Sequence, residues 1–244
     1  MPLSIIIPTL NEEAALPATL ASVAALTPPP HEVIVADAGS DDRTVEISQA
    51  AGVQVMTGLA QGRAGQMKAG ASKAVGDQFC FLHADSEVPS DFVRLVDDVL
   101  RDPDTALAGF ISVMRGATGV RRITTAHNFI KTWYAPLLFR TLSFFKGARL
   151  LFGDQVIVCR RADFEAVGGW DPQQNIMEGD EMCLRMVRGG YGRVRLVPRK
   201  VWSSDRRVAE WGFWRANFTY LYVGLMWGFG AKPDRLSQHY EDVR

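Results

Sequence analysis

Short apolar segments alternate with helix-forming segments through the first third of this chain. Residues 3–8, 32–37, 53–56 and 78–82 have the β-branched and aromatic content of buried strands, and the segments between them, 14–26, 41–51 and 63–75, have apolar residues at helical spacing. Strands that alternate with helices pair in parallel, because each helix carries the chain back across the sheet. We therefore predict an α/β fold with a doubly wound, mainly parallel central sheet and helices on both faces.

The rest of the chain is less regular. Strands are expected at residues 106–114, 155–159 and 193–197, and helices at 161–167, 178–187, 209–229 and, as a pair split near Pro136, 121–145. No repeat, linker or low-complexity tract divides the sequence. We expect one domain over residues 1–244, in which residues 1–104 and 105–205 form two halves and residues 206–244 a C-terminal helical extension.

The charges of the chain are unevenly distributed, although its formal net charge is zero. Residues 1–104 contain 15 Asp and Glu against 6 Lys and Arg, residues 105–244 contain 12 acids and 21 bases, and no acid lies between Thr105 and Gly153. An acidic half is suited to collecting a cation, and a basic, aromatic-rich half to an anionic partner or a phospholipid surface. A nucleic acid is disfavoured as that partner, because the expected pocket lies in the acidic half.

The cysteines indicate a reducing compartment. Cys80, Cys159 and Cys183 are far apart and lie in apolar segments, so we expect reduced thiols in the core of a cytoplasmic protein. The N-terminus lacks the basic and apolar segments of a signal peptide.

Polar residues follow the second and fourth predicted strands. Asp37 ends the second, and His83-Ala84-Asp85 ends the fourth. Because α/β sheets bind ligands at the carboxyl ends of their strands, both carboxylates should face one crevice. His83 and Asp85, at i and i+2, could bind a divalent ion, and Asp37 could accept hydrogen bonds from a nucleobase or ribose. Alternatively, Asp37 and Asp85 could each form hydrogen bonds only within their own turns, and Ser40 could cap the helix that follows Asp37.

Gln61-Gly62-Arg63 opens the third predicted helix. The free backbone N–H groups of a helix start, together with the Arg63 guanidinium, could cradle a phosphate group. A glycine at a helix start is common, so this feature identifies a site only in combination with its neighbours.

Together these segments resemble family 2 of the inverting glycosyltransferases, which have the Rossmann-like GT-A fold. Six segments between Ser4 and Gly190, in the family's order, carry the resemblance: SIIIPTLNEE, EVIVADAGSDDRT, GRAGQMKAGA, FLHADSEVP, FGDQVIVCRRADFEAVGGWD and MEGDEMCLRMVRGG. Each is common alone, but their joint occurrence is specific. The chain is most similar to the short bacterial subgroup that includes arsenosugar-type glycosyltransferases, whose SxRR-like segment is matched by Ser204-Asp205-Arg206-Arg207.

The resemblance implies an enzyme that moves a hexosyl or related glycosyl group from a UDP- or GDP-linked donor to an acceptor hydroxyl, with Mn²⁺ or Mg²⁺ as cofactor. Residues 1–104 would bind the nucleotide, and residues 105–205 would carry the acceptor and catalytic side. The nucleotide would be contacted by Pro8, Thr9, Leu10, Glu12, Asp37, Gly39, Gly62, Arg63, Ala84 and Asp85, and the metal by Asp85 and His83. Gly153, Asp154, Gln155, Arg206 and Arg207 would lie on the acceptor and diphosphate side.

The metal-binding element departs from the family's D-x-D pattern. Histidine brings no negative charge where the family has its first aspartate, so the ion would be held more weakly, or only by Asp85 and the diphosphate.

The second departure concerns the catalytic base. Where the family has a Glu-Asp pair before a helix, this chain reads Glu178-Gly179-Asp180-Glu181. Asp180 is our first choice for the base, with Glu178 and Glu181 as alternatives. These acids could instead only stabilise the helix dipole, and Glu181 could form an i, i+4 ion pair with Arg185.

The chemistry expected of such a site is a single displacement. A metal ion and an arginine would neutralise the leaving diphosphate, and a base on the opposite side would take the acceptor's proton, which inverts the anomeric centre. The glycine at 179 and the histidine at 83 also leave open a non-catalytic nucleotide-sugar-binding protein. A nucleotidyltransferase would need a Gly-rich loop with Arg and Lys after the first strand, which PTLNEEAA lacks.

Two aromatic segments with basic residues could pack internally or in a dimer, which we favour, or lie on a membrane surface. One segment holds Trp133, Tyr134, Phe139, Phe144 and Phe145 interleaved with Lys131, Arg140 and Lys146. The other, residues 217–231, is uncharged but shorter than the ~20 residues of a membrane span. Contact with the inner face of a membrane and a lipid-linked acceptor would follow from the second alternative. His31, His127 and His239 have no partners in the sequence and receive no role.

Overall fold

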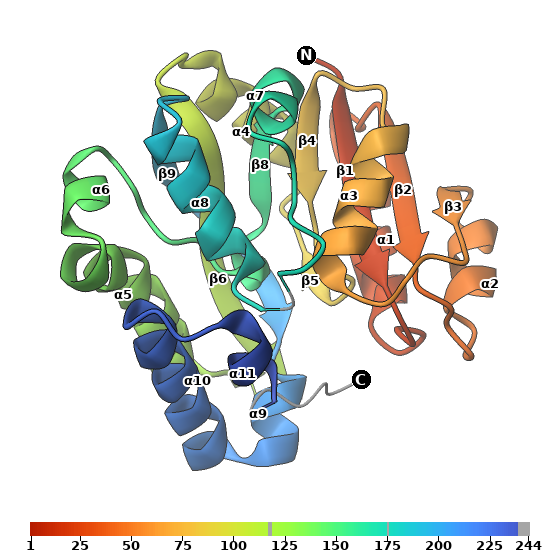
Figure 1. Cartoon of the computed structure of the whole chain (residues 1–244). Coiled ribbons are helices and arrows are strands. Elements are labelled where there is room, and N and C mark those ends of the chain that lie inside the picture. Colours follow the sequence, from red (N-terminus) through yellow and green to blue (C-terminus); the bar gives the residue numbers. More distant parts are fainter. Residues whose placement is uncertain (117–118, 175, 239–244) are drawn as a thin grey trace.

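The computed structural model describes residues 1–116, 119–174 and 176–238. Within these residues the strands form one nine-stranded sheet in the order β3-β2-β1-β4-β8-β6-β9-β5, with β7 paired to β6. Helices cover both faces of this curled sheet (Figure 1). The prediction of an α/β fold with a doubly wound central sheet is therefore confirmed.

The first half has the expected parallel arrangement. It contains the strands β1 (Leu3–Thr9), β2 (Glu32–Asp37), β3 (Gln54–Met56) and β4 (Gln78–Phe81), and the helices α1 (Leu16–Ala24), α2 (Thr44–Ala50) and α3 (Arg63–Lys73). β1 pairs in parallel with β2 and β4, and β2 with β3. Because side chains alternate along a strand, Ile6 and Ile34 pack beneath α3, whereas Ile5 and Ile7 pack beneath α1 on the other face.

The second half extends the same sheet with mixed pairing. Its strands are β5 (Ser86–Glu87), β6 (Thr105–Gly116), β7 (Gly119–Val120), β8 (Ile157–Arg160) and β9 (Arg193–Ser204), and the helices α4 (Phe92–Arg101), α7 (Arg161–Ala166) and α8 (Glu178–Arg188) lie between them. β8 is antiparallel to both β4 and β6, whereas β6 and β9 are parallel. The parallel arrangement therefore holds for β1 to β4 and for β6 with β9, and β8 joins the two halves.

The C-terminal helices differ from the predicted boundaries. They are α9 (Arg206–Trp211), α10 (Phe213–Gly228) and α11 (Pro233–Ser237), and α10 packs beside α5 (Arg122–Phe139), which α6 (Thr141–Phe145) follows (Figure 1). The single helix expected over residues 209–229 is wrong, because Gly212, with φ of 79°, breaks it.

The helix pair expected over residues 121–145 is present, but its break falls at Arg140 rather than at Pro136, since α5 continues to Phe139. A proline removes one N–H from a helix and leaves the carbonyl four residues earlier without its partner. Here the backbone N–H of Leu150 donates to that carbonyl, on Thr132, at 3.3 Å. The segment after α6 therefore supplies the hydrogen bond that Pro136 cannot make.

The cysteines are as expected. Cys80, Cys159 and Cys183 are buried and free, and burial raises the pKa of each thiol above its ordinary range. Among the helices described, none has both the length and the hydropathy needed to cross a bilayer.

Candidate active site

One cavity lies where β1, β4 and β9 end. Its walls include most of the residues singled out by the sequence: Pro8, Thr9, Leu10, Glu12, Arg63, His83, Ala84, Asp85, Gly153, Asp154, Glu178, Asp180, Arg206 and Arg207. The remaining five, Asp37, Gly39, Gly62, Gln155 and Glu181, are not among the lining residues. Asp85 from the end of β4 and Asp180 from α8 thus share one cavity, although they are far apart in the chain.

Asp37 lies directly behind the cavity wall. Both of its carboxylate oxygens are occupied: Oδ1 accepts the backbone N–H groups of Gly39 and Ser40, and Oδ2 accepts the hydroxyls of Thr9 and Ser40. Asp37 therefore fixes the turn after β2 and orients Thr9, which does line the cavity. Its contact with a nucleobase stays a prediction.

The expected cap of the helix after this turn is different. The prediction that Ser40 caps α2 is wrong, because α2 begins only at Thr44 and the Ser40 hydroxyl accepts the N–H of Asn11. Asp42 takes the capping role instead, accepting the backbone N–H of Thr44 at 2.9 Å.

Three of the predicted residues act through the backbone or from behind the wall. Gly39 and Gly62 have φ of 87° and 129°, in the region that favours glycine, where the turn after β2 and the start of α3 require it. Gln155 is buried, accepts the N–H of Phe152 at 2.9 Å and donates to the Thr132 hydroxyl at 3.1 Å. It therefore holds the segment that carries Gly153 and Asp154.

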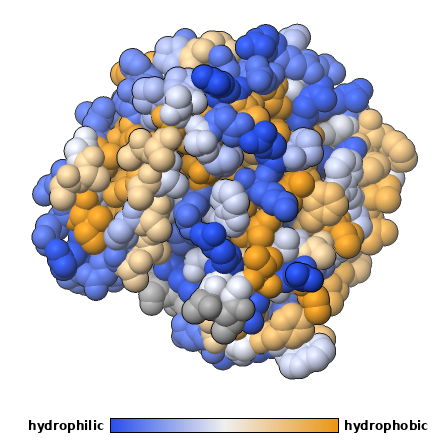
Figure 2. Space-filling view, turned by 180° about the vertical axis from the view of Figure 1, so that it is seen from behind, coloured by the Kyte–Doolittle hydropathy of each residue, from blue (hydrophilic) through white to orange (hydrophobic). Residues whose placement is uncertain are grey.

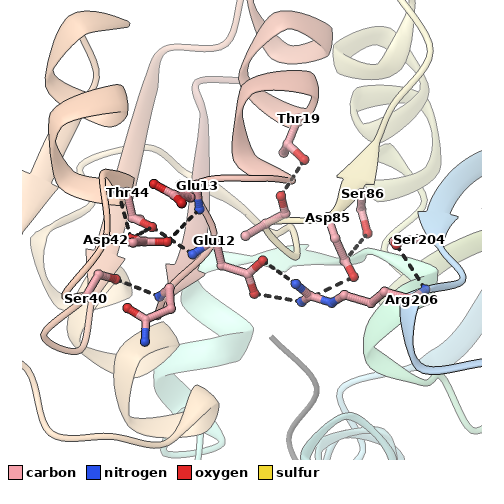
Figure 3. Close-up of polar contacts among 12 residues, drawn as sticks. Glu12, Glu13, Thr19, Ser40, Asp42, Thr44, Asp85, Ser86, Ser204 and Arg206 are labelled. Atoms are coloured by element: carbon pink, nitrogen blue, oxygen red, sulfur yellow. Dashed lines mark hydrogen bonds and ion pairs between the residues drawn. The ribbon is translucent and has the colours of Figure 1, made fainter. Parts of the chain in front are cut away.

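An arginine connects two acids on one side of the cavity. The Arg206 guanidinium forms two contacts of 2.7 Å with the Glu12 carboxylate and lies 3.6 Å from Asp85 (Figure 3). Arg206 comes from the first turn of α9, Glu12 from the loop after β1 and Asp85 from the loop after β4. The cation of this cluster is in position to meet an anionic group that enters the cavity.

His83 is held neutral. Burial, together with the positive charges of Arg63, Arg206 and Arg207, lowers the pKa of its imidazole to about 3. The ring packs on Gly153, where an added Cβ would lie 2.3 Å from its Cε1 atom. A neutral imidazole is the form that can bind a metal ion.

The protein ligands for a metal are few. In the described parts of the chain, no three His, Cys, Asp or Glu side chains are arranged to hold an ion. Asp85 and His83 could contribute one oxygen and one nitrogen, and Mg²⁺ and Mn²⁺ favour oxygen-rich coordination. These residues therefore fit an ion only if a bound diphosphate supplies further oxygens.

The three candidate bases at the start of α8 have different surroundings. The Glu178 carboxylate lines the cavity and lies 3.5 Å from the Arg63 guanidinium. Asp180 is buried and its Oδ1 atom has no hydrogen-bond partner. Burial raises the pKa of Asp180 well above its usual range, and the nearby Lys131 ammonium opposes this. Glu181 points away and pairs with Arg185 at 2.6 Å, as the i, i+4 alternative predicted.

Packing explains the glycine at 179. A Cβ at this position would lie 2.5 Å from the backbone oxygen of Leu151 and 2.9 Å from Ile157 Cδ1. No side chain fits there unless α8 moves away from the 151–157 segment. An acid is therefore accommodated at the next position, Asp180, which faces the cavity.

Sequence reasoning missed the wall that α5 and α10 provide. Thr124, His127, Asn128 and Lys131 of α5 line the cavity, as do Tyr220, Val223 and Gly224 of α10. The Asn128 amide donates to the Asp154 carboxylate at 2.5 Å, and the Lys131 ammonium lies 3.4 Å from the Phe152 ring centroid. The signal was present as polar residues at helical spacing, 124, 128 and 131, within an apolar segment.

The histidines given no role have separate outcomes. His127 lines the cavity and lies 3.0 Å from the Tyr134 hydroxyl, a position that the sequence did not indicate. His239 falls outside the described residues.

Backbone strain accompanies the cavity. In the described chain, Asn11, Val156 and Met177 are the non-glycine residues with positive φ, at 55°, 52° and 60°. Asn11 follows the lining residue Leu10, Met177 lines the cavity itself, and Val156 follows Gly153–Gln155. Such conformations cost on the order of 1–3 kcal/mol each and concentrate at functional sites.

Solved structures similar to this chain have the GT-A fold. They include the mannosyltransferase PcManGT from Pyrobaculum calidifontis in complex with GDP-Man and Mn²⁺, with a TM-score of 0.69 and 17% identity over 91% of this chain and 62% of that one. Glucosyl-3-phosphoglycerate synthase from M. tuberculosis has a TM-score of 0.63 and 21% identity over 95% and 81%. Residues 1–349 of S. aureus TarS with UDP-GlcNAc have a TM-score of 0.63 and 14% identity over 98% and 70%.

These likenesses establish the fold, and the sequence establishes the family. No curated protein matches the chain. The model of the family "Glycosyl transferase family 2" matches residues 4–168, which is more than half of the sequence and contains β1 to α7. The chain therefore belongs to glycosyl transferase family 2.

Proposed function

We propose that this protein transfers a sugar from a nucleoside-diphosphate donor to an acceptor hydroxyl by a single displacement that inverts the anomeric centre. The observation that carries the proposal is the shared cavity of Asp85 and Asp180, with Arg63 and Arg206 in its walls. Family membership supports the reaction class, and one domain over residues 1–244 supplies both sides of the site. The neighbours that bind GDP-Man, UDP or UDP-GlcNAc support a UDP- or GDP-linked donor.

The donor would lie along the β1 and β4 side of the cavity. Pro8, Thr9, Leu10 and Glu12 would contact the nucleotide, Asp37 would orient Thr9 or bind the base, and the Gly39 and Gly62 turns would keep the backbone clear. Arg63, Arg206 and Arg207 would face the diphosphate, whose negative charge grows as the bond to the sugar breaks. Asp85 and His83 would hold a Mn²⁺ or Mg²⁺ ion with the diphosphate, and that ion would neutralise the leaving group.

Asp180 is proposed as the base. Its raised pKa suits a group that must accept a proton near neutral pH, and its Oδ1 atom has no hydrogen-bond partner within the protein. Glu178 is less suited, because its carboxylate already pairs with the Arg63 guanidinium at 3.5 Å. Glu181 is occupied by Arg185 outside the cavity.

The acceptor would enter from the side of α5 and α10. Gly153, Asp154, Lys131 and Tyr220 lie on this side, and the Asp154 carboxylate could orient an acceptor hydroxyl while Gln155 holds its segment from behind. We propose a lipid-linked acceptor, because the helices that form this side of the cavity, α5 and α10, expose many large apolar side chains. The subgroup of arsenosugar-type glycosyltransferases remains our proposal for its place in the family, on the strength of Ser204-Asp205-Arg206-Arg207.

A non-catalytic nucleotide-sugar-binding protein is the second candidate. The few metal ligands of the chain favour it, since weak metal binding would impair loss of the diphosphate.

One experiment separates the two candidates. The protein is screened by thermal unfolding against UDP-, GDP- and dTDP-sugars, with and without Mn²⁺, because a ligand of the native state raises the Tm. Any donor that raises the Tm is then assayed for release of free sugar or nucleoside diphosphate. Slow release supports the transferase. Binding without release from any donor, with or without added cell lipids, supports the second candidate.

A further inference from the structure

Helix α5 buries its polar side and exposes its apolar side. Its buried residues recur every four positions and are mostly polar: Thr124, Asn128, Thr132 and Pro136. Its exposed side carries Ile123, Phe129, Ile130, Trp133, Leu137 and Leu138. A surface helix of a globular protein normally buries its apolar side and exposes its polar one. The exposed apolar side of α5 would therefore be stabilised by contact with an apolar partner outside the fold.

The neighbouring helices continue this surface. α6 exposes Leu142 and Phe145, and α10 exposes Trp214, Phe218, Leu221, Tyr222 and Leu225 at helical spacing, followed by Phe229. We call these side chains, with the exposed ones of α5, the apolar face. In the described chain, only Met1, Val75 and Val120 are exposed large hydrophobic residues outside it. Figure 2 shows hydrophobic residues gathered along the side of the molecule formed by these helices.

The parts of the apolar face form one surface. The rings of Phe139 in α5 and Phe229 after α10 are 5.2 Å apart, and Arg140 donates to the Gly228 carbonyl at 2.9 Å. The Arg149 guanidinium lies over the rings of Trp133 in α5 and Phe144 in α6. These contacts fix the helices relative to one another without covering their outer sides.

The charge near the apolar face is positive. Arg122, Lys146, Arg215 and Lys232 are exposed at the ends of these helices or just beyond them, and residues 105–153 contain no acid. An apolar surface with basic residues around it is complementary to the interface of an anionic bilayer. A symmetric dimer fits less well, because an isologous interface would bring the same positive charges together.

A small apolar crevice lies between the apolar face and the cavity. It lies between α5 and α10 and is lined on the outer side by Phe139, Leu221 and Leu225. On the inner side it shares Lys131, Phe152, Met177, Tyr220 and Gly224 with the cavity wall. The acceptor side of the cavity therefore lies close to the apolar face.

We propose that the apolar face is a membrane-docking surface that lies on an anionic phospholipid bilayer, with α5, α6 and α10 in the interface and none of them across it. The bilayer accepts the aromatic and aliphatic side chains, and its negative headgroups attract the basic residues. The inference rests on the proposed function only where a lipid-linked acceptor is concerned. The docking itself needs no donor.

Vesicle co-sedimentation tests the docking. The full chain is mixed with vesicles of phosphatidylcholine alone or of phosphatidylcholine with phosphatidylglycerol. We expect binding to the mixed vesicles, weaker binding at high salt, and little binding to the neutral vesicles. The triple variant Leu138→Gln, Leu142→Gln, Phe218→Gln should lower the binding about tenfold or more, because three apolar side chains leave the interface.

A matched control is available on the opposite half of the chain. Val75 is 63% exposed, as Phe218 is, and lies just beyond α3, so Val75→Gln should bind vesicles like the wild type. The Tm of every variant is measured, and Leu142→Gln alone, at a position that is 83% exposed, replaces the triple variant if the latter is unfolded. Lys146→Gln and Arg122→Gln should lower binding to the mixed vesicles.

Three results would overturn the proposal: no vesicle binding, equal binding to both kinds of vesicle, or unchanged binding by the folded apolar variant. Sedimentation of the protein without vesicles is measured in parallel. A dimer that the same variant dissociates, together with no vesicle binding, would assign the apolar face to a second copy of the chain. Nucleotide release is assayed without vesicles, so failure of the transferase proposal is recorded separately from failure of docking.

Discussion

Arg206 and Glu12 form an ion pair with two contacts of 2.7 Å between residues 194 positions apart in the chain. The Glu12 side chain is only 11% exposed, and the same guanidinium lies 3.6 Å from Asp85. The pair therefore joins the loop after β1 to the C-terminal helices across the cavity. An incoming diphosphate would compete with Glu12 for this arginine.

Replacing that arginine should affect both stability and turnover. Arg206→Met leaves the Glu12 carboxylate without these contacts, which we expect to lower the free energy of unfolding by about 1–3 kcal/mol in urea denaturation. If Arg206 also meets the leaving group, kcat should fall about 100-fold or more. Arg43→Met is the control, because the Arg43–Glu46 pair is about two-thirds exposed and should contribute little. An unchanged kcat in Arg206→Met would remove Arg206 from the diphosphate site.

Asp180→Asn should abolish turnover and leave nucleotide binding intact. The amide keeps the shape of the side chain but cannot accept the acceptor's proton, so kcat should fall by about 100-fold to 10,000-fold. Glu181→Gln is the matched control in the same helical turn, since Glu181 pairs with Arg185 outside the cavity. Nucleotide affinity is measured by calorimetry for both variants. Full activity of Asp180→Asn would reject this base, and Glu178→Gln would then be the variant to assay.

The pH profile of kcat/KM should report the surroundings of Asp180. Burial raises the pKa of this carboxyl, and the active form is the ionised one, so activity should increase with pH along a limb whose midpoint lies above the ordinary aspartate range. Lys131→Met removes the positive charge that lowers this pKa, and the midpoint should therefore move to higher pH. Lys146→Met, at an exposed lysine beyond α6, should leave the midpoint unchanged. A midpoint that stays fixed or falls in Lys131→Met would contradict the coupling.

Manganese should bind together with the nucleotide. Because no three potential ligands of the described chain are grouped to hold an ion, we expect weak binding of Mn²⁺ alone and tight binding once a nucleoside diphosphate is present. Electron paramagnetic resonance of Mn²⁺ with and without UDP or GDP measures both. Asp85→Asn should lose the joint binding. Its retention in that variant would place the ion elsewhere.

Gly179 and Gly65 should respond oppositely to alanine. Both lie in the first turn of a helix, but a Cβ at Gly179 would lie 2.5 Å from the Leu151 carbonyl oxygen, whereas one at Gly65 meets only Pro172 at 4.0 Å. Gly179→Ala should lower the free energy of unfolding by about 1–3 kcal/mol. Gly65→Ala should be neutral or stabilising by up to about 1 kcal/mol. Equal effects would mean that packing does not determine the glycine at 179.

The strands and helices of the first half could be predicted because local signals agree there. Each of β1 to β4 is a short apolar segment, and the helices between them carry their own apolar spacing, so little depends on distant residues. The breaks in the second half depend on long-range contacts. Pro136 stays within α5 because Leu150, distant in sequence, binds the Thr132 carbonyl, and no local pattern reveals this.

The residues of the candidate site also fall into two groups, those that sheet geometry places and those that depend on long-range packing. Residues at strand ends, such as Asp85, could be placed in the cavity because sheet geometry brings strand ends together. Lys131 and Tyr220 could not, since their place depends on how α5 and α10 pack beside the sheet. Asp37 shows where this reasoning fails. It lies at the end of β2 as expected, but its carboxylate accepts hydrogen bonds from the turn after β2 and from the Thr9 hydroxyl.

The hydrogen bond from the Leu150 N–H to the Thr132 carbonyl also couples movement of α5 at the surface to the interior of the protein. Gln155 donates to the hydroxyl of that same threonine, and the Asn128 amide donates to Asp154, so three hydrogen bonds join α5 to the segment that carries Asp154. Any tilt of α5 must either move residues 150–155 with it or break these three hydrogen bonds. A force on the outer side of α5 would therefore also displace the residues around Asp154.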